Sequence, residues 1–311
     1  MDIHRLPNRF VRIAALFGIA AAPHLDGSVA VPVRYAPLNK MIITVSINGH
    51  AANLLLDTGA SQTMIDAESA QLLGVAANQF GGRRYIGYQR FNGQLTPIAF
   101  IRNLTAGGIN LGNLNVALVD SSGRGGFASN AGNSAAHVDG ILAADVLLPH
   151  KAVINTRTKF VYFQPHGAPA LQLANVASTE RFTKVPLRRE ENGGFTVPCS
   201  TGGQTGRLFV DTGAFVTTFS EALFKSLGVA LQPAHVSARF SDGVSRQYDM
   251  GEIKDLAIGA FRVPPKKFGV ASLPRFTSQG GGAPIIGILG MDLLYDCDAI
   301  IDFGSMNLFL K

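Results

Sequence analysis

The sequence AANLLLDTGASQTMIDAESAQLLGV at residues 51–75 has a counterpart at residues 205–229, TGRLFVDTGAFVTTFSEALFKSLGV. The two align without a gap and share D-T-G-A, a threonine three residues later and a closing L-G-V. Chance similarity of composition would not preserve that register. The sequence therefore indicates an internal duplication, in which each copy is one structural unit.

A second pair of matching segments follows, VDGILAADVL at residues 138–147 and IIGILGMDLL at residues 285–294. Each then runs into a segment rich in β-branched and aromatic residues, which is typical of strands. Before each D-T-G-A, two apolar runs flank a turn dipeptide, Asn48-Gly49 in the first half and Gly202-Gly203 in the second, as in a β-hairpin. Each D-T-G-A is therefore expected at the end of a buried strand.

After each D-T-G-A turn the sequence predicts a short helix, with Asp66 and Ser220 as N-caps and Gly74 and Gly228 marking the C-terminal ends. The segment around residues 164–183 has two prolines and low hydrophobicity, which is typical of a linker. The expected organisation is a signal peptide at 1–30, a first lobe at 31–165, a linker at 166–183 and a second lobe at 184–311.

The composition favours a folded all-β protein. Of the 311 residues, 47% are apolar and only 15% are charged, which suits a large buried core and excludes global disorder. The 35 glycines and the short runs of Val, Ile, Phe and Thr favour strands joined by tight turns. The net charge of +6 is spread along the chain without a basic helix or an aromatic RNA-binding motif, so we expect no nucleic-acid partner.

Metal and cofactor sites have no support in the sequence. The two cysteines, Cys199 and Cys297, belong to no C-x-x-C pair, and the seven histidines show no metal-ligand spacing. We interpret the cysteines as two buried thiols. One disulfide is the alternative in an oxidising compartment, because only geometry decides between the two.

The N-terminus has the layout of a secretory signal peptide. Three arginines among residues 5–12 precede an apolar run at residues 13–22, and small residues then offer a cleavage site at Ser28 and Ala30 or, earlier, at residues 20–22. The run is shorter than the ~20 residues of a membrane span. We expect an exported protein, periplasmic or secreted. If the segment is only an N-terminal tail, the protein is cytoplasmic.

The repeated aspartate suggests chemistry. An aspartate after an apolar strand is costly to bury unless it is hydrogen-bonded or functionally required. One D-T-G is a weak signal, since a single aspartate can simply cap a turn. Two copies in equivalent repeats are a strong signal, because packing about a pseudo-two-fold axis would bring Asp57 and Asp211 together. Such a pair shares a proton, so one carboxyl can act as general base on water while the other protonates a carbonyl.

These motifs resemble those of the pepsin–retropepsin superfamily of aspartic proteases, specifically its bacterial retropepsin-like group. LLLDTGA with VDGILAAD, and LFVDTGA with IIGILGMD, carry the resemblance, which covers nearly all of residues 35–311. It implies an all-β fold of two pseudo-symmetric β-barrel lobes with an active-site cleft between them. The implied catalytic residues are Asp57 and Asp211. The implied supporting residues are threonines that brace the pair and glycines that complete the turns: Thr58, Gly59, Thr212 and Gly213.

The resemblance also implies a β-hairpin flap in each half. The first flap is expected at residues 84–94, with Tyr88 and Gly93, and the second at residues 239–247, turning at Asp242-Gly243. Such flaps would close over an extended peptide and exclude bulk water. Tyr88 is a candidate for a supporting hydrogen bond near the site. The alternative is a surface aromatic side chain that packs on a loop.

Three departures from the family pattern stand out. Asp139 replaces the aliphatic residue before Gly140, and Ala143 replaces the glycine of the second repeat. Ala60 and Ala214 stand where pepsin-like enzymes commonly have serine or threonine. A missing hydroxyl removes support from the ionised carboxylate, so the pH optimum is expected to be less acidic than pepsin's.

The remaining acidic residues are interpreted as structural. Asp145 and Asp292 recur in the repeat and are expected to cap or brace a helix. Four others are expected at the surface or in turns: Asp66, Asp120, Asp242 and Asp302.

The sequence thus predicts an aspartic endopeptidase that cuts peptide or protein substrates as a monomeric pseudo-dimer, with no cofactor, no metal and no stable membrane span. The alternative is a non-catalytic retropepsin-like protein that binds peptides or an envelope polymer, although both D-T-G-A motifs are intact. A third possibility is a dormant enzyme that needs removal of an N-terminal segment.

Overall fold

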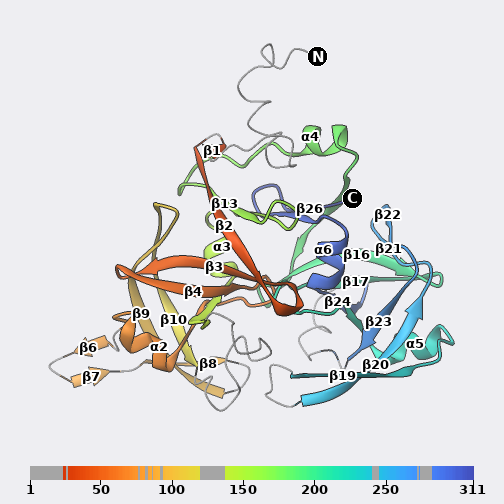
Figure 1. Ribbon diagram of the computed structural model, residues 1–311, viewed down its shortest axis with the longest axis horizontal. Coiled ribbons are helices and arrows are strands. Elements are labelled where there is room, and N and C mark those ends of the chain that lie inside the picture. The colour runs from red at the N-terminus through yellow and green to blue at the C-terminus, as the bar shows by residue number, and fades with distance from the viewer. Residues whose placement is uncertain are drawn as a thin grey trace, which may run out of the picture.

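The computed structural model describes residues 24–25, 27–75, 78–80, 83–85, 87–91, 94–119, 137–239, 245–271, 273 and 282–311. This part of the chain is mostly β, as predicted, and most of its strands gather into two large sheets. Two lobes lie side by side, one on each side of Figure 1, and both chain halves contribute strands above them.

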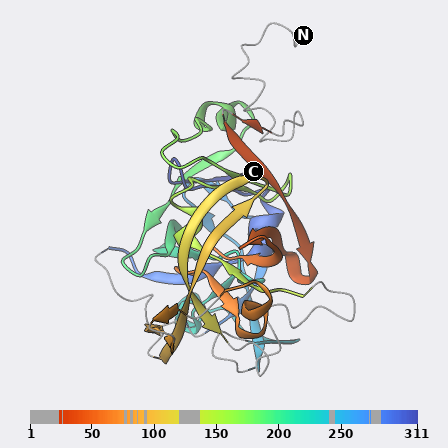
Figure 2. The same cartoon turned by 90° about the vertical axis from the view of Figure 1, so that its left-hand side faces the viewer.

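The first sheet has 14 strands among the described residues. They are β1 (His24–Leu25), β2 (Ser28–Ala36), β3 (Lys40–Ile47), β4 (His50–Leu56), β5 (Met64–Asp66), β8 (Gly87–Phe91), β9 (Gln94–Ala106), β10 (Ile109–Val119), β11 (Gly140–Leu142), β12 (Val153–Asn155), β13 (Phe160–Phe163), β14 (Thr183–Pro186), β25 (Ile300–Asp302) and β26 (Asn307–Leu310). In Figure 2 the long strands β9 and β10 curve across the first lobe, while β2 runs down its outside.

The second sheet has 10 strands in the same described set. They are β15 (Arg188–Arg189), β16 (Phe195–Thr201), β17 (Gln204–Val210), β18 (Thr218–Phe219), β19 (Gln232–Arg239), β20 (Ser245–Ile253), β21 (Ala257–Ile258), β22 (Phe261–Arg262), β23 (Lys266–Val270) and β24 (Ile285–Leu289). A separate hairpin pairs β6 (Asn78–Phe80) with β7 (Arg83–Tyr85).

Short helices fill the remaining described segments. They are η3 (Pro37–Asn39), α2 (Ala67–Leu72), α3 (Ala144–Leu147), α4 (Ala174–Thr179), α5 (Glu221–Ser226) and α6 (Met291–Asp296). The two helices that follow the D-T-G-A turns begin as predicted. The side chain of Asp66 accepts the amides of Glu68 and Ser69 at α2, and Ser220 accepts the amide of Leu223 at α5.

The two lobes repeat one strand order, which runs β3-β4-β11-β5-β10-β9-β8 in the first and β16-β17-β24-β18-β23-β20-β19 in the second. The sense of pairing repeats as well. β4–β11 and β17–β24 are parallel, β11–β5 and β24–β18 antiparallel, and β5–β10 and β18–β23 parallel. This agreement confirms the predicted duplication.

The turns before each D-T-G-A are hairpin turns, as predicted. Asn48 and Gly49 both have positive φ, 51° and 92°, as a type I′ turn requires. Gly202 and Gly203 join β16 to β17 with φ of 54° and 74°. Each hairpin therefore delivers its second strand, β4 or β17, to the start of an aspartate turn.

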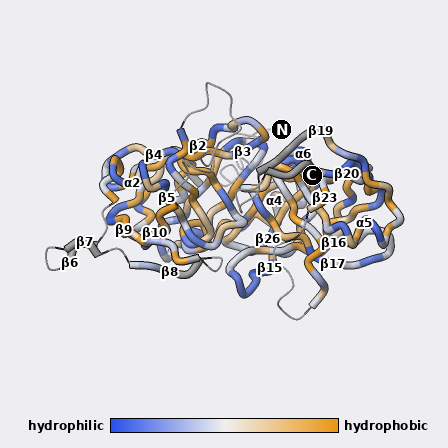
Figure 3. The backbone as a smooth tube through the Cα atoms, turned by 90° about the horizontal axis from the view of Figure 1, so that it is seen from below, coloured by the Kyte–Doolittle hydropathy of each residue, from blue (hydrophilic) through white to orange (hydrophobic). Residues whose placement is uncertain are grey.

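Six antiparallel strands join the halves, in the order β14-β26-β25-β12-β13-β2. The central pair matches Ile154 of the first half with Ile301 of the second. β2 continues beyond this group and pairs with β3, so one strand serves both the shared strands and the first lobe. One hydrophobic cluster includes buried residues of both lobes. Within it, the ring centroids of Phe195 and Phe303 lie 4.8 Å apart. Figure 3 shows hydrophobic segments in the strands of both lobes.

Among the acidic residues expected at the surface or in turns, the surface alternative is wrong for two that the structure describes. Asp66 and Asp302 are both buried rather than exposed. Each carboxylate can be buried because backbone amides satisfy it: Asp66 caps α2, and Asp302 accepts the amides of Gly304 and Ser305 in a turn. Asp120 and Asp242 lie outside the described residues. Cys199 and Cys297 are both free and buried, as interpreted from the sequence.

Candidate active site

Each D-T-G-A aspartate begins the turn after a buried strand. The amide of Asp57 donates to the carbonyl of Leu142 at 3.0 Å, and the amide of Asp211 donates to that of Leu289 at 3.0 Å. Leu142 and Leu289 end the strands β11 and β24, which lie parallel to β4 and β17. In each repeat, the strand β11 or β24 therefore fixes where the D-T-G-A turn begins.

Backbone amides hold one oxygen of each carboxyl group. Oδ1 of Asp57 accepts the amides of Gly59 at 2.8 Å and Ala60 at 3.1 Å. The second lobe repeats this arrangement around Asp211, at 2.8 and 3.0 Å. Both aspartates are partly buried at the level of the whole residue.

Two fully buried threonines lock the turns together across the lobes. The amide of Thr58 donates to Oγ1 of Thr212 at 3.0 Å, and the amide of Thr212 donates to Oγ1 of Thr58 at 3.1 Å. Each hydroxyl then donates to a carbonyl of the opposite lobe, Thr58 to Val210 at 2.9 Å and Thr212 to Leu56 at 2.8 Å. The four bonds satisfy all of these buried groups and set the distance between the aspartates.

The glycines of the turns are needed because each one faces the opposite aspartate. A Cβ on Gly59 would lie 2.4 Å from Cγ of Asp211, and a Cβ on Gly213 would lie 2.5 Å from Cγ of Asp57. No side chain fits at either position. The resemblance gave these glycines a place in the turns, and the geometry adds that they make room for the two carboxyl groups.

The two carboxyl groups lie close together, each against the glycine of the opposite turn, so the charge of one affects the pKa of the other. Burial raises the pKa of Asp57, and hydrogen bonds from Asp211 and the turn amides lower it in part. Burial raises the pKa of Asp211 well above its usual range, and the charge of Asp57 raises it further. The pair therefore retains one proton at pH values where an isolated aspartate is ionised.

The recurring acidic residues Asp145 and Asp292 brace the aspartate turns. Asp145 accepts the hydroxyl of Thr63 at 2.6 Å and its amide at 2.9 Å. Asp292 accepts the hydroxyl and the amide of Thr217 at 2.6 and 2.7 Å. Both threonines are the ones that follow each D-T-G-A by three residues, so the repeated Thr and Asp were the sequence signal for this contact.

Asp139 ties the second motif of the first lobe to its neighbours. It accepts the hydroxyl of Ser69 at 2.8 Å and the amide of Asn53 at 2.8 Å. Nε2 of His137 lies 2.9 Å from the same hydroxyl. Sequence reasoning missed Ser69 and Asn53, because neither has an equivalent motif in the second repeat. The contacts explain why an acidic residue is stable before Gly140.

Both expected flaps are hairpins. β8 pairs with β9, and β19 pairs with β20, and the strands β8 and β19 lie at the bottom of their lobes in Figure 1. The first hairpin is displaced from the expected range. Arg84 belongs to β7, which pairs with β6, and the returning strand is β9 rather than a segment ending at residue 94. Gly93, Asp242 and Gly243 lie outside the described residues.

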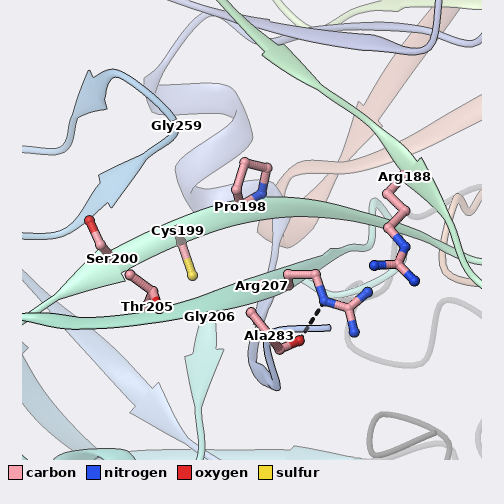
Figure 4. Close-up of a pocket in the computed structure, with 9 residues that line it drawn as sticks. All are labelled: Arg188, Pro198, Cys199, Ser200, Thr205, Gly206, Arg207, Gly259 and Ala283. Atoms are coloured by element: carbon pink, nitrogen blue, oxygen red, sulfur yellow. Dashed lines mark hydrogen bonds between the residues drawn. The ribbon is translucent and has the colours of Figure 1, made fainter. Parts of the chain in front are cut away.

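A hollow in the surface of the second lobe does not involve Asp57 or Asp211. Figure 4 shows it between β16, β17 and the segment around Ala283, with Arg188 and Arg207 on its rim. Arg207 is buried, pairs with Glu190 and donates to the carbonyl of Ala283 at 2.7 Å. Neither aspartate lines this hollow. The buried ion pair is therefore a structural contact beneath β17.

Two searches of the described part of the chain give negative results. No cluster of His, Cys, Asp or Glu in it could hold a metal ion. None of its helices has the length and apolar character needed to cross a membrane.

Two family models match the chain, one in each half. The model described as "gag-polyprotein putative aspartyl protease" matches residues 43–126, which include Asp57 and Tyr88. The model described as "Aspartyl protease" matches residues 197–293, which include Asp211 and the segment of β24. Each match thus contains one of the two D-T-G-A turns described above.

Proposed function

The chain carries two retropepsin-like aspartyl protease domains, one in each half, and from this we propose that it is an aspartic endopeptidase in which Asp57 and Asp211 form one catalytic pair. One chain supplies both aspartates, so a monomer is sufficient. The observation that supports the proposal best is the reciprocal threonine contact, which joins the two aspartate turns across the lobes.

The proposed reaction uses the single proton that the pair retains. The ionised carboxylate accepts a proton from a water molecule as the water oxygen attacks the carbonyl carbon of the peptide bond. The protonated carboxyl donates its proton to the carbonyl oxygen, which gives a tetrahedral diol. One carboxyl group then protonates the amide nitrogen while the other takes a proton from a diol hydroxyl, so the C–N bond breaks to give a carboxylic acid and an amine and the pair returns to its starting protonation. Charge never accumulates beyond one unit on the pair.

The substrate is proposed to be an extended polypeptide. Within the described part of the chain, β8 and β19 stand at the ends of their strand orders and pair on one side only. An edge strand presents unpaired amides and carbonyls, which an extended peptide can bind as an added strand. Both edges belong to the hairpins on the same side of the molecule, so one peptide can contact both lobes as it passes the dyad.

The test is cleavage of an unbiased peptide mixture across pH 3–7, with and without pepstatin. The wild-type protein, Asp57→Asn and Asp211→Asn are compared, and Asp296→Asn is the matched control because that carboxylate is 56% exposed at the end of α6. Both dyad variants are expected to lose about 10²–10⁴-fold or more in rate, since each removes a general acid–base. The control is expected to cleave at the wild-type rate.

Cleavage that survives either dyad substitution would overturn the assignment of the pair. A wild-type protein that binds peptides of the mixture and cuts none of them would instead support the non-catalytic alternative. A protein that cuts only after loss of its N-terminal segment would identify the dormant form.

A further inference from the structure

The two lobes differ at the carboxylates that brace the aspartate turns, Asp145 and Asp292. In the first lobe both oxygens of Asp145 bind Thr63, since Oδ1 accepts its hydroxyl at 2.6 Å and Oδ2 accepts its amide at 2.9 Å. In the second lobe Oδ1 of Asp292 accepts both the hydroxyl and the amide of Thr217, at 2.6 and 2.7 Å. Thr217 therefore fixes only one oxygen of Asp292, and Oδ2 can meet another partner.

Lys266, in β23, is that partner. Its Nζ lies 3.8 Å from Oδ2 of Asp292 and 2.5 Å from Oδ2 of Asp296, and both carboxylates belong to α6. Only 32% of the Lys266 side chain and 22% of the Asp292 side chain are exposed. Water screens such a pair less than it screens two fully exposed charges at the same distance, so Lys266 attracts the free oxygen of Asp292.

The register of the strands gives the equivalent position in the first lobe. The equivalent strands β5 and β18 pair in parallel with β10 and β23, which makes Ala117 equivalent to Gly269. Three residues earlier on each strand, Leu114 is therefore equivalent to Lys266. Leu114 packs against the hydrophobic core, and burial raises the pKa of Asp145. The lysine at this position is thus a feature of the second lobe.

The contact reaches Asp211 through the backbone. The amide of Met291 donates to the carbonyl of Ala214 at 2.8 Å. The next amide, that of Asp292, donates to the carbonyl of Phe215 at 3.2 Å. The amide of Ala214 in turn donates to Oδ1 of Asp211 at 3.0 Å. Ala214 is held by α6 at its carbonyl and holds Asp211 with its amide, so a shift of α6 would move the turn around Asp211.

We propose that Lys266 is a positioning residue for the catalytic pair, which holds the carboxylate of Asp292 in the orientation that braces the turn of Asp211. The proposal rests on the proposed function and adds to it a residue outside both repeated motifs. Lys266 acts through Asp292 on the position of Asp211 during the reaction, and not on the affinity for the peptide. Its loss is therefore expected to lower kcat and to leave KM nearly unchanged.

The first test measures kcat and KM on one peptide taken from the wild-type digest. Lys266→Met removes the charge and is expected to lower kcat about threefold to tenfold, because Asp292 loses the partner of its second oxygen. Lys266→Arg keeps a positive charge and is expected to retain most of kcat. Lys254→Met is the matched control, since it removes another lysine of the second lobe, whose Nζ lies 4.0 Å from a carboxylate oxygen of Glu252. It is expected to change neither constant.

Asp296→Asn separates the two contacts of Lys266. The side chain of Asp296 is 56% exposed at the end of α6, and its loss leaves Lys266 beside Asp292. If Lys266 acts through Asp292, this variant keeps the wild-type kcat. An equal loss of kcat in Asp296→Asn and Lys266→Met would contradict the route through Asp292.

Amide hydrogen exchange measures the brace without catalysis. The amides of Thr217 and Thr63 donate to the two bracing carboxylates, so they are matched reporters in the two lobes. In Lys266→Met the amide of Thr217 is expected to exchange about threefold to tenfold faster, while the amide of Thr63 keeps its wild-type rate and shows that the variant folds. Exchange followed by NMR resolves the two amides. Lys266→Gln is measured in the same way should the methionine variant not fold.

The outcomes separate this proposal from the proposed function. If the wild-type protein cuts no peptide but Lys266→Met speeds exchange at Thr217, the catalytic proposal falls and the brace stands. If the protein cuts peptides and Lys266→Met changes neither kcat nor this exchange, the positioning role is wrong and the catalytic proposal stands. A raised KM with an unchanged kcat would also overturn the positioning role, because it would place Lys266 at a peptide contact.

Discussion

Both the charge and the shape of their surroundings constrain the two aspartates, Asp57 and Asp211. Each carboxyl lies against the opposite glycine and accepts two amides, and both have raised pKa values. The repeat predicted the pair, and the family resemblance implied its supporting residues. The role of Tyr88 stays a prediction, since its side chain is exposed on the flap hairpin and the choice of face on a strand changes with a shift of one residue.

The pair is expected to destabilise the folded protein as pH rises. The pKa values of the two aspartates in the folded protein lie above the unfolded value of about 3.9. Below that pH both groups are protonated, and their contribution to the free energy of unfolding is at its maximum. It is lost as pH rises through the folded values. Asp211→Asn mimics the neutral acid and avoids this loss. Its midpoint of thermal unfolding should therefore exceed that of wild type at pH 7, and the gap should shrink towards pH 3.5.

At pH 7 the variant is expected to gain about 1.4 kcal/mol in free energy of unfolding for each unit by which folding raises the pKa of Asp211. Thermal unfolding at several pH values measures it, with Asp296→Asn as the control for loss of an exposed charge. A gap of the same size at every pH would contradict the assignment of a raised pKa to Asp211.

The alanines after each D-T-G predict the pH dependence of activity. Their amides reach the aspartates at 3.1 and 3.0 Å, but their side chains have no hydroxyl. Ala60→Ser is expected to add a donor to the ionised pair and to move the acidic limb of the kcat/KM profile to lower pH. For the wild-type protein, an optimum below about pH 3 would contradict the argument from coupled carboxylates.

Secondary-structure elements place the dyad through contacts that are invisible in a local sequence pattern. The helix caps and hairpin turns could be predicted, because Asp66, Ser220 and Asn48-Gly49 act on residues beside them. The contact of Asp139 with Ser69 joins residues from two motifs that the repeat does not relate. The expected flap range began too early because nothing local distinguishes β7 from β8.

The threonine contact between the two turns is expected to be sensitive to loss of a hydroxyl. Thr58→Val keeps the shape of the side chain but leaves the carbonyl of Val210 and the amide of Thr212 without their partners. Each unpaired buried group costs about 1–3 kcal/mol. Denaturant unfolding should show this loss, and activity should fall with it.

Thr58→Ser is the control for that change, because it retains the hydroxyl and removes only a methyl group. It is expected to lie within about 1.5 kcal/mol of the wild-type protein, the range of small core substitutions. Equal losses of stability in the valine and serine variants would show that packing, rather than the cross-lobe hydrogen bonds, holds the turns.

At the scale of the whole molecule, the duplication predicted two lobes, and it could not predict the strands that join them. The shared strands lie outside the aligned D-T-G-A segments, and their order depends on pairing between distant halves, such as Ile154 with Ile301. The boundary residues 166–183 contain the helix α4 and the start of β14, so the predicted linker has structure of its own.

The position of β2 affects how the N-terminus can be processed, if the chain is exported as the sequence predicts. Ser28 is buried, and residues 29 and 30 pair with β13 in the shared strands. Cleavage after Ala30 would remove these residues together with β1, whereas cleavage at residues 20–22 would leave them in place. We expect the mature protein to begin before His24.

Two truncated proteins test this expectation, one beginning at residue 23 and one at residue 31. The shorter protein is expected to unfold at a lower denaturant concentration, because it loses backbone pairing at the junction of the lobes. N-terminal sequencing of the exported protein gives the natural site. A mature protein that begins at residue 31 and is equally stable would contradict the expectation.

The cross-lobe threonine bonds also determine the point in synthesis at which the two aspartate turns can first pair. They join segments 154 residues apart, and β12 cannot pair with β25 before residue 302 has been synthesised. At about 5–20 residues per second, a ribosome completes the first aspartate turn about 8–30 s before the second. Throughout that interval the nascent chain has one carboxyl and no partner for it. Joining both halves in one polypeptide would therefore delay the proposed proteolysis until translation is nearly finished, whereas separate half-length chains would become active whenever two of them met.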